Sequence, residues 1–265
     1  MILNFFQYSF LVKALIAGSL LAIITGLLGV FLVLRKLSLI GDGLSHVSFG
    51  AVALGLLLGV YPYYISLPLT VLASFLVFRL MSKAKIYGDT AIGIISAAGV
   101  SLGVIIASLA GGFNVDLFSY LFGSLLAVSM MEIYFLLILT TVTIYFIVYN
   151  YRALFALSFD ESSAKTMCLK TDKLNRLILI LLALTVAAAV KAVGVMLVSA
   201  LLILPAASAL QRTLSFKKTL LRSVFFALLS VIFGLLASVG FNLPTGASIV
   251  VAGLFIFIIN YLLRS

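Results

Sequence analysis

Long apolar runs with almost no charge constrain this chain more than any other feature of its sequence. The run from Ala14 to Leu34, for example, contains no Asp, Glu, Lys or Arg. About 20 apolar residues are enough for an α-helix to cross ~30 Å of hydrocarbon. Hydrophobic residues make up 65% of the chain and charged residues only 9%, whereas roughly a quarter of a soluble domain is charged. The pattern therefore predicts an all-α, polytopic membrane protein, and the unbroken runs argue against the in-out alternation of a β-barrel.

Eight or nine membrane helices are expected within a single transmembrane domain that spans residues 1–265. A further short or re-entrant helix is possible at 113–129, on the outer side. The first apolar run is interpreted as a permanent helix, because no charged residue precedes Lys13 and no cleavage site of small residues is evident. The nine candidate segments are 10–34, 42–60, 64–82, 91–110, 131–149, 175–190, 193–210, 218–238 and 246–262.

The net charge of +10 could suggest a nucleic-acid partner, but the distribution of the basic residues argues against one. They cluster in short gaps between apolar runs, which is the pattern of cytoplasmic loops under the positive-inside rule. This asymmetry predicts the amino terminus outside and the carboxyl terminus inside. The single cysteine, Cys168, excludes an internal disulfide. The basic clusters are Arg35 and Lys36, then Arg79 to Lys85, Arg152 to Arg176, Arg212 to Arg222, and Arg264.

The stretch GDGLSHVSFG at 41–50 places a rare carboxylate and the only histidine of the chain four residues apart. Hydrocarbon penalises both groups, so Asp42 and His46 are candidates for function. On a helix, positions i and i+4 share one face, and the two side chains could bind one divalent ion. Imidazole suits zinc and related metals, and carboxylate suits harder ions such as manganese. A buried Asp–His hydrogen bond that joins helices and a proton relay are the alternatives that the residues leave open.

No motor or catalytic motif is visible in the sequence. It contains no G-x-x-x-x-G-K-[ST] phosphate-binding loop, no G-x-S-x-G nucleophile elbow and no H-E-x-x-H metal motif. A single histidine also excludes catalytic arrangements that need two. If the chain moves a solute uphill, the energy is expected to come from a separate subunit or an ion gradient.

The interval 150–176 is the longest polar-rich part of the chain. The stretch from Ser158 could form a short helix, because Ser158 or Asp160 can cap its amino end and acidic residues sit in its first turn. This segment is either an ordinary cytoplasmic loop or a short docking helix for a cytoplasmic partner.

Four stretches in order along nearly the whole chain resemble the integral membrane permeases of zinc/manganese-type ABC importers. They are FLVLRKLSLIGDGLSHVSFGAVALG (31–55), YLFGSLLAVS (120–129), GVMLVSALLILPAASA (194–209) and FNLPTGASIVVAG (241–253). In the last stretch Asn242 stands where the family usually has an acid. The resemblance implies a type II importer fold like that of the vitamin B12 and siderophore permeases, with fewer helices.

The resemblance also implies a function and a set of partners. Two permease copies pair, two cytoplasmic ATPase subunits bind beneath them, and an extracytoplasmic protein delivers the metal. Asp42 and His46 fall on the motif ascribed to metal passage. The chain is then not an enzyme and holds no permanent cofactor, and ATP binds on the partner chain. The location implied is the plasma membrane of a bacterium or archaeon, the inner one where there are two.

The stretch FDESSAKTMCLK (159–170) resembles the family's coupling segment, which is expected at about 158–172. Asp160, Glu161 and Ala164 match it in character. Cys168 replaces the usual glycine, which would supply a helix-ending turn. Met196 and Ser199 are candidates to line the pathway, with helix packing as the alternative role.

Two other functions stay open alongside a metal-ion permease. One is a permease of the same broad fold that carries a chelate such as a siderophore or vitamin B12. The other is a stand-alone metal transporter driven by an ion gradient, with the Asp–His pair as a proton relay. Zinc, manganese and iron all tolerate one carboxylate and one imidazole, so the metal is not specified.

Overall fold

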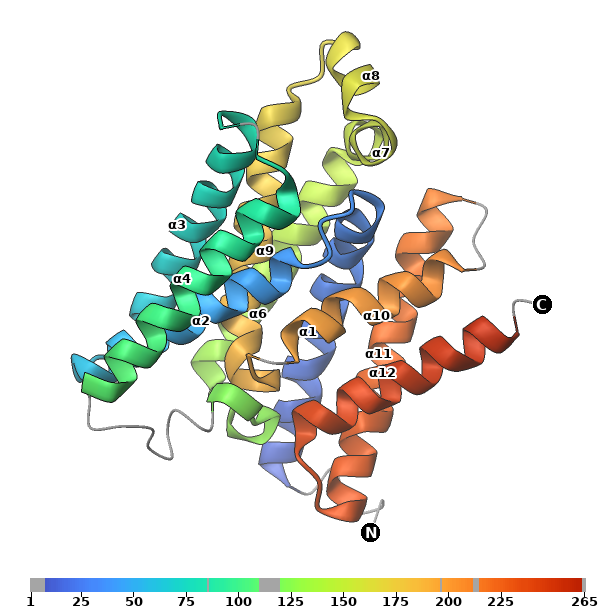
Figure 1. The fold of residues 1–265 in the computed structure, drawn as a ribbon. Helices are drawn as coiled ribbons and strands as arrows, with labels where there is room; N and C mark the ends of the chain where they lie inside the picture. The colour runs from blue at the N-terminus through green and yellow to red at the C-terminus, as the bar shows by residue number, and fades with distance from the viewer. Residues whose placement is uncertain (1–7, 85, 110–119, 196, 212–214, 264–265) are drawn as a thin grey trace.

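The computed structural model describes residues 8–84, 86–109, 120–195, 197–211 and 215–263, and all regular elements in these ranges are helical (Figure 1). Each of the nine expected segments is found as a helix, and within the described ranges eight helices are long and apolar enough to cross a membrane. The elements are α1 (Ser9–Leu34), α2 (Ile40–Leu57), α3 (Tyr63–Ser82), α4 (Gly88–Leu109), the 3-10 turn η2 (Leu125–Ala127), α6 (Met130–Tyr149), α7 (Tyr151–Phe159), α8 (Glu161–Thr166), α9 (Thr171–Val193), α10 (Val198–Leu210), α11 (Phe216–Phe241) and α12 (Thr245–Leu262).

The ninth helix, α10, is shorter than the expected segment at 193–210. It has 13 residues, which rise only about 20 Å as an α-helix. The chain breaks between α9 and α10 because Gly194 has φ +98°, a conformation that ends the preceding helix. Of the possible re-entrant helix at 113–129, residues 113–119 lie outside the described residues. In the described remainder, residues 120–122 are helical and Leu125–Ala127 form a single 3-10 turn.

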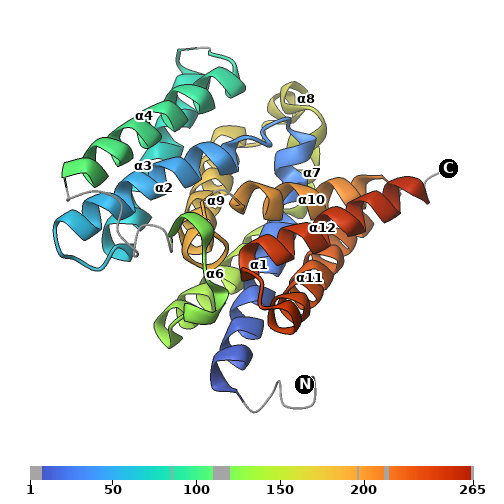
Figure 2. The same cartoon turned by 60° about the horizontal axis from the view of Figure 1, so that its bottom comes forward.

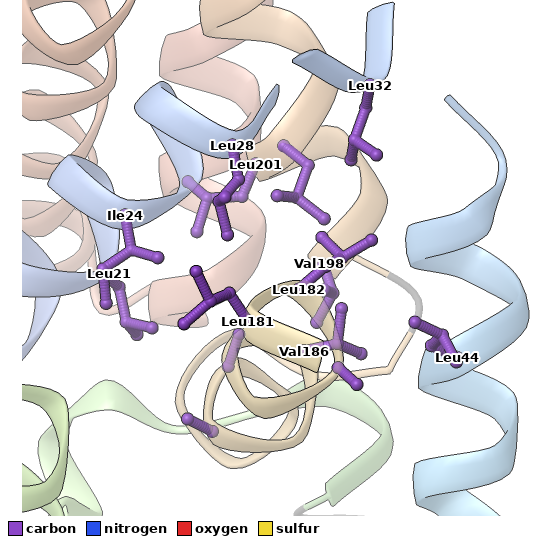
Figure 3. Packing of buried hydrophobic residues seen from close by; sticks show 14 of the residues in the cluster. Leu21, Ile24, Leu28, Leu32, Leu44, Leu181, Leu182, Val186, Val198 and Leu201 are labelled. Carbon is purple, nitrogen blue, oxygen red and sulfur yellow. The ribbon is translucent and has the colours of Figure 1, made fainter. Parts of the chain in front are cut away.

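The core lies where α1 and α9 cross the middle of the bundle. Figure 3 shows Leu21, Ile24 and Leu28 of α1 on one side of Leu181 and Leu182 of α9, with Val198 and Leu201 beside them. Figure 2 shows α2, α3 and α4 on one side of α9, and α10, α11 and α12 on the other. Helices α1 and α9 are therefore mostly buried by protein, whereas α4 and α12 expose most of their apolar side chains.

Helices α2 and α4 pack with almost no space between their backbones. A β-carbon at Gly99 of α4 would lie 2.7 Å from the Val47 amide nitrogen of α2. Gly103, one turn further along α4, lies against Gly50 of α2. This is the close approach that small residues four apart permit in a membrane, and it fixes α4 against the part of α2 that carries His46.

Three irregular segments far apart in the sequence meet at the break between α9 and α10. The Val195 amide donates to the Tyr120 carbonyl at 3.2 Å, and the Leu125 amide donates to Oγ1 of Thr245 at 3.1 Å. The segments belong to three of the four stretches that carry the family resemblance. They satisfy one another's backbone groups, as non-helical backbone inside a membrane protein must.

The short helices α7 and α8 lie together at one end of the bundle, and the described chain begins near the opposite end (Figure 1). The ends of α1 and α3 and the starts of α9 and α11 also lie towards α8 (Figure 1). These elements carry most of the basic residues outside the apolar spans. The basic residues therefore gather at the end of the bundle that holds α7 and α8.

Candidate functional site

Asp42 and His46 lie one turn apart on α2, as the spacing predicts. The His46 Nε2 atom is 3.5 Å from Asp42 Oδ2, and their side chains are 27% and 44% exposed. Asp42 is in the first turn of α2, where the positive end of the helix dipole favours a carboxylate. The pair is therefore not a buried link between two helices: both groups come from one helix and remain accessible.

Within the described residues, no group of three or more His, Cys, Asp or Glu side chains could hold a metal ion. Asp42 and His46 supply two donors from one helix, which is fewer than the four to six ligands of a typical transition-metal site. Any ion at the pair would need further donors from water or from another chain.

Of the two further pathway candidates, Ser199 lies in the first turn of α10 against α2, and Met196 lies outside the described residues. A β-carbon at Gly41 would be 3.7 Å from Ser199 Oγ, and that hydroxyl is buried without a hydrogen-bond partner. Gly41, which precedes Asp42 in the first turn of α2, thus packs against a serine at the start of α10.

The helix α8 is capped by Asp160, as one of the two expected caps. Its carboxylate accepts hydrogen bonds from the Ser162 amide at 2.9 Å and from the Ser162 hydroxyl at 2.6 Å. The side-chain hydrogen bonds from Ser162 and Ser163 lower the pKa of Asp160 to about 2. Ser158, the other expected cap, is instead part of α7 and donates to the Leu154 carbonyl.

Glu161 anchors α8 to two other elements. Arg35, which follows α1, donates to its carboxylate at 2.9 Å and also donates to Asn175 of α9 at 2.6 Å. Burial alone would raise the pKa of Glu161, but the hydrogen bond from Lys165 and the charge of Arg35 outweigh burial and lower it. Burial lowers the pKa of Arg35, and Glu161 opposes that effect.

The end of α8 shows how the chain turns at Cys168, where the family usually has a glycine. Ala164 is fully buried beneath the helix, and its carbonyl accepts from the Leu169 amide at 3.3 Å, while the Cys168 amide donates to Lys165 at 3.0 Å. These two bonds define a Schellman turn, which requires a left-handed residue at its centre. Cys168 adopts φ +56° there, so the glycine-type turn forms with a cysteine in place of the glycine.

A second polar cluster, at the end of the bundle opposite α8, was not among the predicted sites. Glu132 of α6 is 4% exposed and bonds Lys191 of α9 at 2.6 Å. Tyr61, between α2 and α3, donates to the same carboxylate at 2.6 Å. Burial is the larger cause and this hydrogen bond the smaller one, and together they raise the pKa of Tyr61 to about 12. The S-x-x-E capping box of Ser129 and Glu132, which the structure forms, is the sequence signal that marks this cluster.

Comparison with known proteins assigns nearly the whole chain to one family. The model of the ABC 3 transport family matches residues 7–264. The chain belongs to the ABC 3 transport family. A member of this family is a membrane-spanning transport subunit rather than an enzyme, and the ATPase is a separate subunit.

Two curated relatives and two solved structures extend the match. The chain is 33% identical to the high-affinity zinc uptake system membrane protein ZnuB of Haemophilus influenzae, over 97% of this chain and 99% of the relative. It is 35% identical to the manganese transport system membrane protein MntC of Listeria monocytogenes, over 97% and 91%.

Among solved structures, PsaBC of Streptococcus pneumoniae in complex with Fab matches with a TM-score of 0.86 at 32% identity, over 98% of this chain and 95% of that chain. An inward-facing conformation of a putative metal-chelate type ABC transporter matches with a TM-score of 0.74 at 16% identity, over 95% and 85%. The second match concerns the fold alone. The expected type II permease fold and the resemblance to metal-importer permeases are both confirmed.

Proposed function

We propose that two copies of this chain form the pathway for a divalent transition-metal ion in an ABC importer, and that Asp42 and His46 are the protein ligands the ion meets inside the membrane. The observation that carries the proposal is the pair itself: a carboxylate and an imidazole 3.5 Å apart on one face of α2, both partly exposed. The names of the relatives, which include zinc and manganese systems, support the same class of substrate.

The pair is better suited to a translocation site, which must release its ion, than to a site that binds an ion permanently. A dehydrated dication in low dielectric is very unfavourable unless polar groups replace its water. Two donors per chain lower that penalty, and two chains facing each other would offer four. Because each chain contributes only one carboxylate and one imidazole, the ion can be held briefly and released.

The coupling to ATP is proposed to run through α8. Glu161 binds Arg35, and Arg35 begins the short turn at 35–39 that leads from α1 into the first turn of α2. Glu161 also accepts from Asn175 of α9 at 3.4 Å. A displacement of α8 by an ATPase subunit would therefore act through Arg35 and this turn on the helix that carries Asp42. The coupling segment at about 158–172 matches this role through Asp160, Glu161, Ala164 and Cys168.

The orientation and partners follow from the same assignment. The α8 end, which carries the basic residues, faces the cytoplasm with two ATPase subunits beneath the permease pair. The amino terminus then lies outside and the carboxyl terminus inside, in a bacterial or archaeal plasma membrane. An extracytoplasmic metal-binding protein docks at the opposite end, which holds the Tyr61–Glu132–Lys191 cluster.

The test is ATP-driven uptake in proteoliposomes that contain this chain, its ATPase and its binding protein. We expect uptake of zinc, manganese or ferrous iron, and we expect His46→Ala and Asp42→Ala each to lower it by at least about tenfold, as the loss of a metal-site residue does. Asp89→Asn is the matched control, because Asp89 is an exposed carboxylate in the first turn of α4 and its loss should leave uptake unchanged.

Three results would contradict the proposal. Full uptake in both variants, with ATPase binding retained, would remove Asp42 and His46 from the pathway. Uptake that needs no ATPase would favour a stand-alone transporter driven by an ion gradient. Transport of a siderophore or vitamin B12 without transport of any bare ion would favour a chelate permease.

A further inference from the structure

A cavity of about 430 Å³ opens between the last turn of α3 and the first turns of α9, at the α8 end of the bundle. Three cationic side chains line it: Arg79 of α3, Lys83 directly after α3, and Arg176 of α9. One carboxylate, Asp172, shares the cavity, so its side chains sum to a charge of +2. In the part of the chain that the structure describes, no carboxylate lies within 4.0 Å of any of the three cations, since the ion pairs found involve other residues.

The α3 wall of this cavity changes from apolar to basic along one helix face. Leu72 and Phe75, which are 58% and 46% exposed, precede Arg79 by about two turns and one turn, and Lys83 follows one turn later. Residues at this spacing lie above one another on a helix. This face is apolar within the span and cationic at its end, as expected where a helix runs from the acyl chains to the headgroups of a membrane.

The α9 wall places its cation in a fixed position. The Arg176 guanidinium lies 5.3 Å from the centre of the Phe78 ring, a cation–π contact that holds the guanidinium at the cavity without neutralising it. Two guanidinium groups and one ammonium then surround a space with aromatic side chains on the membrane side. Each guanidinium group can bind two phosphate oxygens at once through two parallel N–H donors.

We propose that this cavity, defined by Arg79, Lys83, Arg176, Phe75 and Phe78, binds the headgroup phosphate of an anionic phospholipid from the leaflet at the α8 end. Charge complementarity selects an anion, and the exposed apolar stripe of α3 leads from the cavity into the hydrocarbon, where the acyl chains would lie. Basic pockets between membrane helices bind such headgroups. The site is independent of Asp42 and His46, so its test does not depend on which ion is transported.

The experiment is lipid retention by the permease assembled with its ATPase, measured by native mass spectrometry. Phosphatidylglycerol and phosphatidylcholine with the same acyl chains are titrated separately. We expect one phosphatidylglycerol per permease chain and no comparable retention of phosphatidylcholine. The double variant Arg79→Gln/Arg176→Gln should weaken phosphatidylglycerol binding by about tenfold or more, because each basic residue near a headgroup contributes substantially to anionic-lipid binding.

Two further variants make the result specific. Lys218→Gln, which removes an exposed base near the start of α11, is the matched control and should retain the lipid as the unchanged protein does. Lys83→Gln, a single change at an exposed position of the cavity, should weaken retention even if the double variant is poorly folded. Thermal unfolding of each variant in phosphatidylcholine checks that the fold is intact.

Four outcomes would overturn the proposal. The first is that the folded cavity variants retain as much phosphatidylglycerol as the unchanged protein does. The second is that the unchanged protein retains phosphatidylcholine as well as phosphatidylglycerol. Displacement of the lipid by millimolar inorganic phosphate would identify a site for free phosphate instead. Retention by the permease alone that is lost on assembly with the ATPase would assign the cavity to the contact between the two proteins.

Discussion

At the scale of single residues, three positions outside glycine adopt the left-handed conformation, among those the structure describes: Lys36, Cys168 and Asn242. Each follows the end of a helix, where such a residue closes the last turn. Asparagine tolerates this conformation because its short polar side chain bonds locally, whereas a cysteine gains no such compensation. The strain at Cys168 is therefore a property of its β-carbon, and it falls in the segment proposed to couple to the ATPase.

Replacing Cys168 by glycine should stabilise the protein. Glycine adopts the left-handed conformation without the steric penalty of a β-carbon, so we expect a gain of about 0.5–1 kcal/mol in the free energy of unfolding. Thermal unfolding of the purified permease in detergent measures it. Cys168→Ala is the control, because it removes the sulfur and keeps the β-carbon. An equal gain in both variants would mean that the thiol, and not the backbone, is the source of the strain.

At the scale of elements, α9 connects the two polar clusters of the structure. Asn175, near its start, bonds Arg35 and Glu161, and Lys191, near its end, pairs with the buried Glu132. The helix is continuous over 23 residues, or about 35 Å. Removal of either partner of the Glu132–Lys191 pair leaves an uncompensated charge, whereas Asn175 is a neutral amide that bonds two charged side chains. Both ends of α9 are therefore held to their neighbours by polar contacts as well as by packing.

The attachment of α8 should depend on pH through Glu161. Its pKa is lowered from the usual 4.5 in the folded protein. A lowered pKa means that the ion pairs of Glu161 stabilise α8 fully above about pH 4.5, and that this contribution is lost as the pH falls through the lower folded-state pKa. The cap formed by Asp160 follows the same sign in a lower window, from 3.8 towards about 2.

A spin label on Cys168, the only cysteine and an exposed one, reports this attachment directly. We expect label mobility to rise below about pH 4.5 in the unchanged protein and to be high already at neutral pH in Glu161→Gln. Lys165→Gln is the control: it removes only the exposed pair within α8, which contributes about 0.3–0.5 kcal/mol. Equal mobility in Glu161→Gln and Lys165→Gln at neutral pH would show that the contact with Arg35 does not hold α8.

At the scale of the whole molecule, the position of the candidate metal pair depends on a helix that contributes no ligand to it. A β-carbon at Gly99 of α4 would lie 2.9 Å from the His46 carbonyl carbon, so α4 sets how α2 is placed. On its other side, α2 begins beside Ser199 of α10. The face that presents Asp42 and His46 is thus defined by helices from both halves of the chain.

Gly99→Ala should disturb both stability and transport. Its methyl group would meet the backbone of α2, which cannot move aside as a flexible side chain can, and such overpacking costs about 1–3 kcal/mol. Gly93→Ala is the control on the same helix, because nothing lies within 4 Å of the added β-carbon. Thermal unfolding and metal uptake together measure the effect. Helix propensity favours alanine at both positions, so a Gly99 variant as stable as the Gly93 variant would mean that the close contact between α2 and α4 does not limit the stability.

Much of this fold and part of the site could be predicted from local patterns. Apolar runs and the charged gaps between them indicate the nine helical segments, because each span must be apolar to lie in lipid. The i,i+4 spacing of Asp42 and His46 places both on one face because the pitch of a helix is fixed. Residue type at the start of the short helix predicts a cap at Ser158 or Asp160, and the structure shows that Asp160 forms it.

The amino-acid sequence by itself thus determined that the chain is a bundle of membrane helices, where those helices lie, and which helix carries the rare ionisable pair. Only the tertiary structure decided which distant groups meet: Arg35 with Glu161, Glu132 with Lys191, and Arg79 with Arg176 across one cavity. The physical reason is that helix formation depends on hydrogen bonds four residues apart. Contacts between helices depend instead on the crossing of surfaces formed by residues that no local pattern connects.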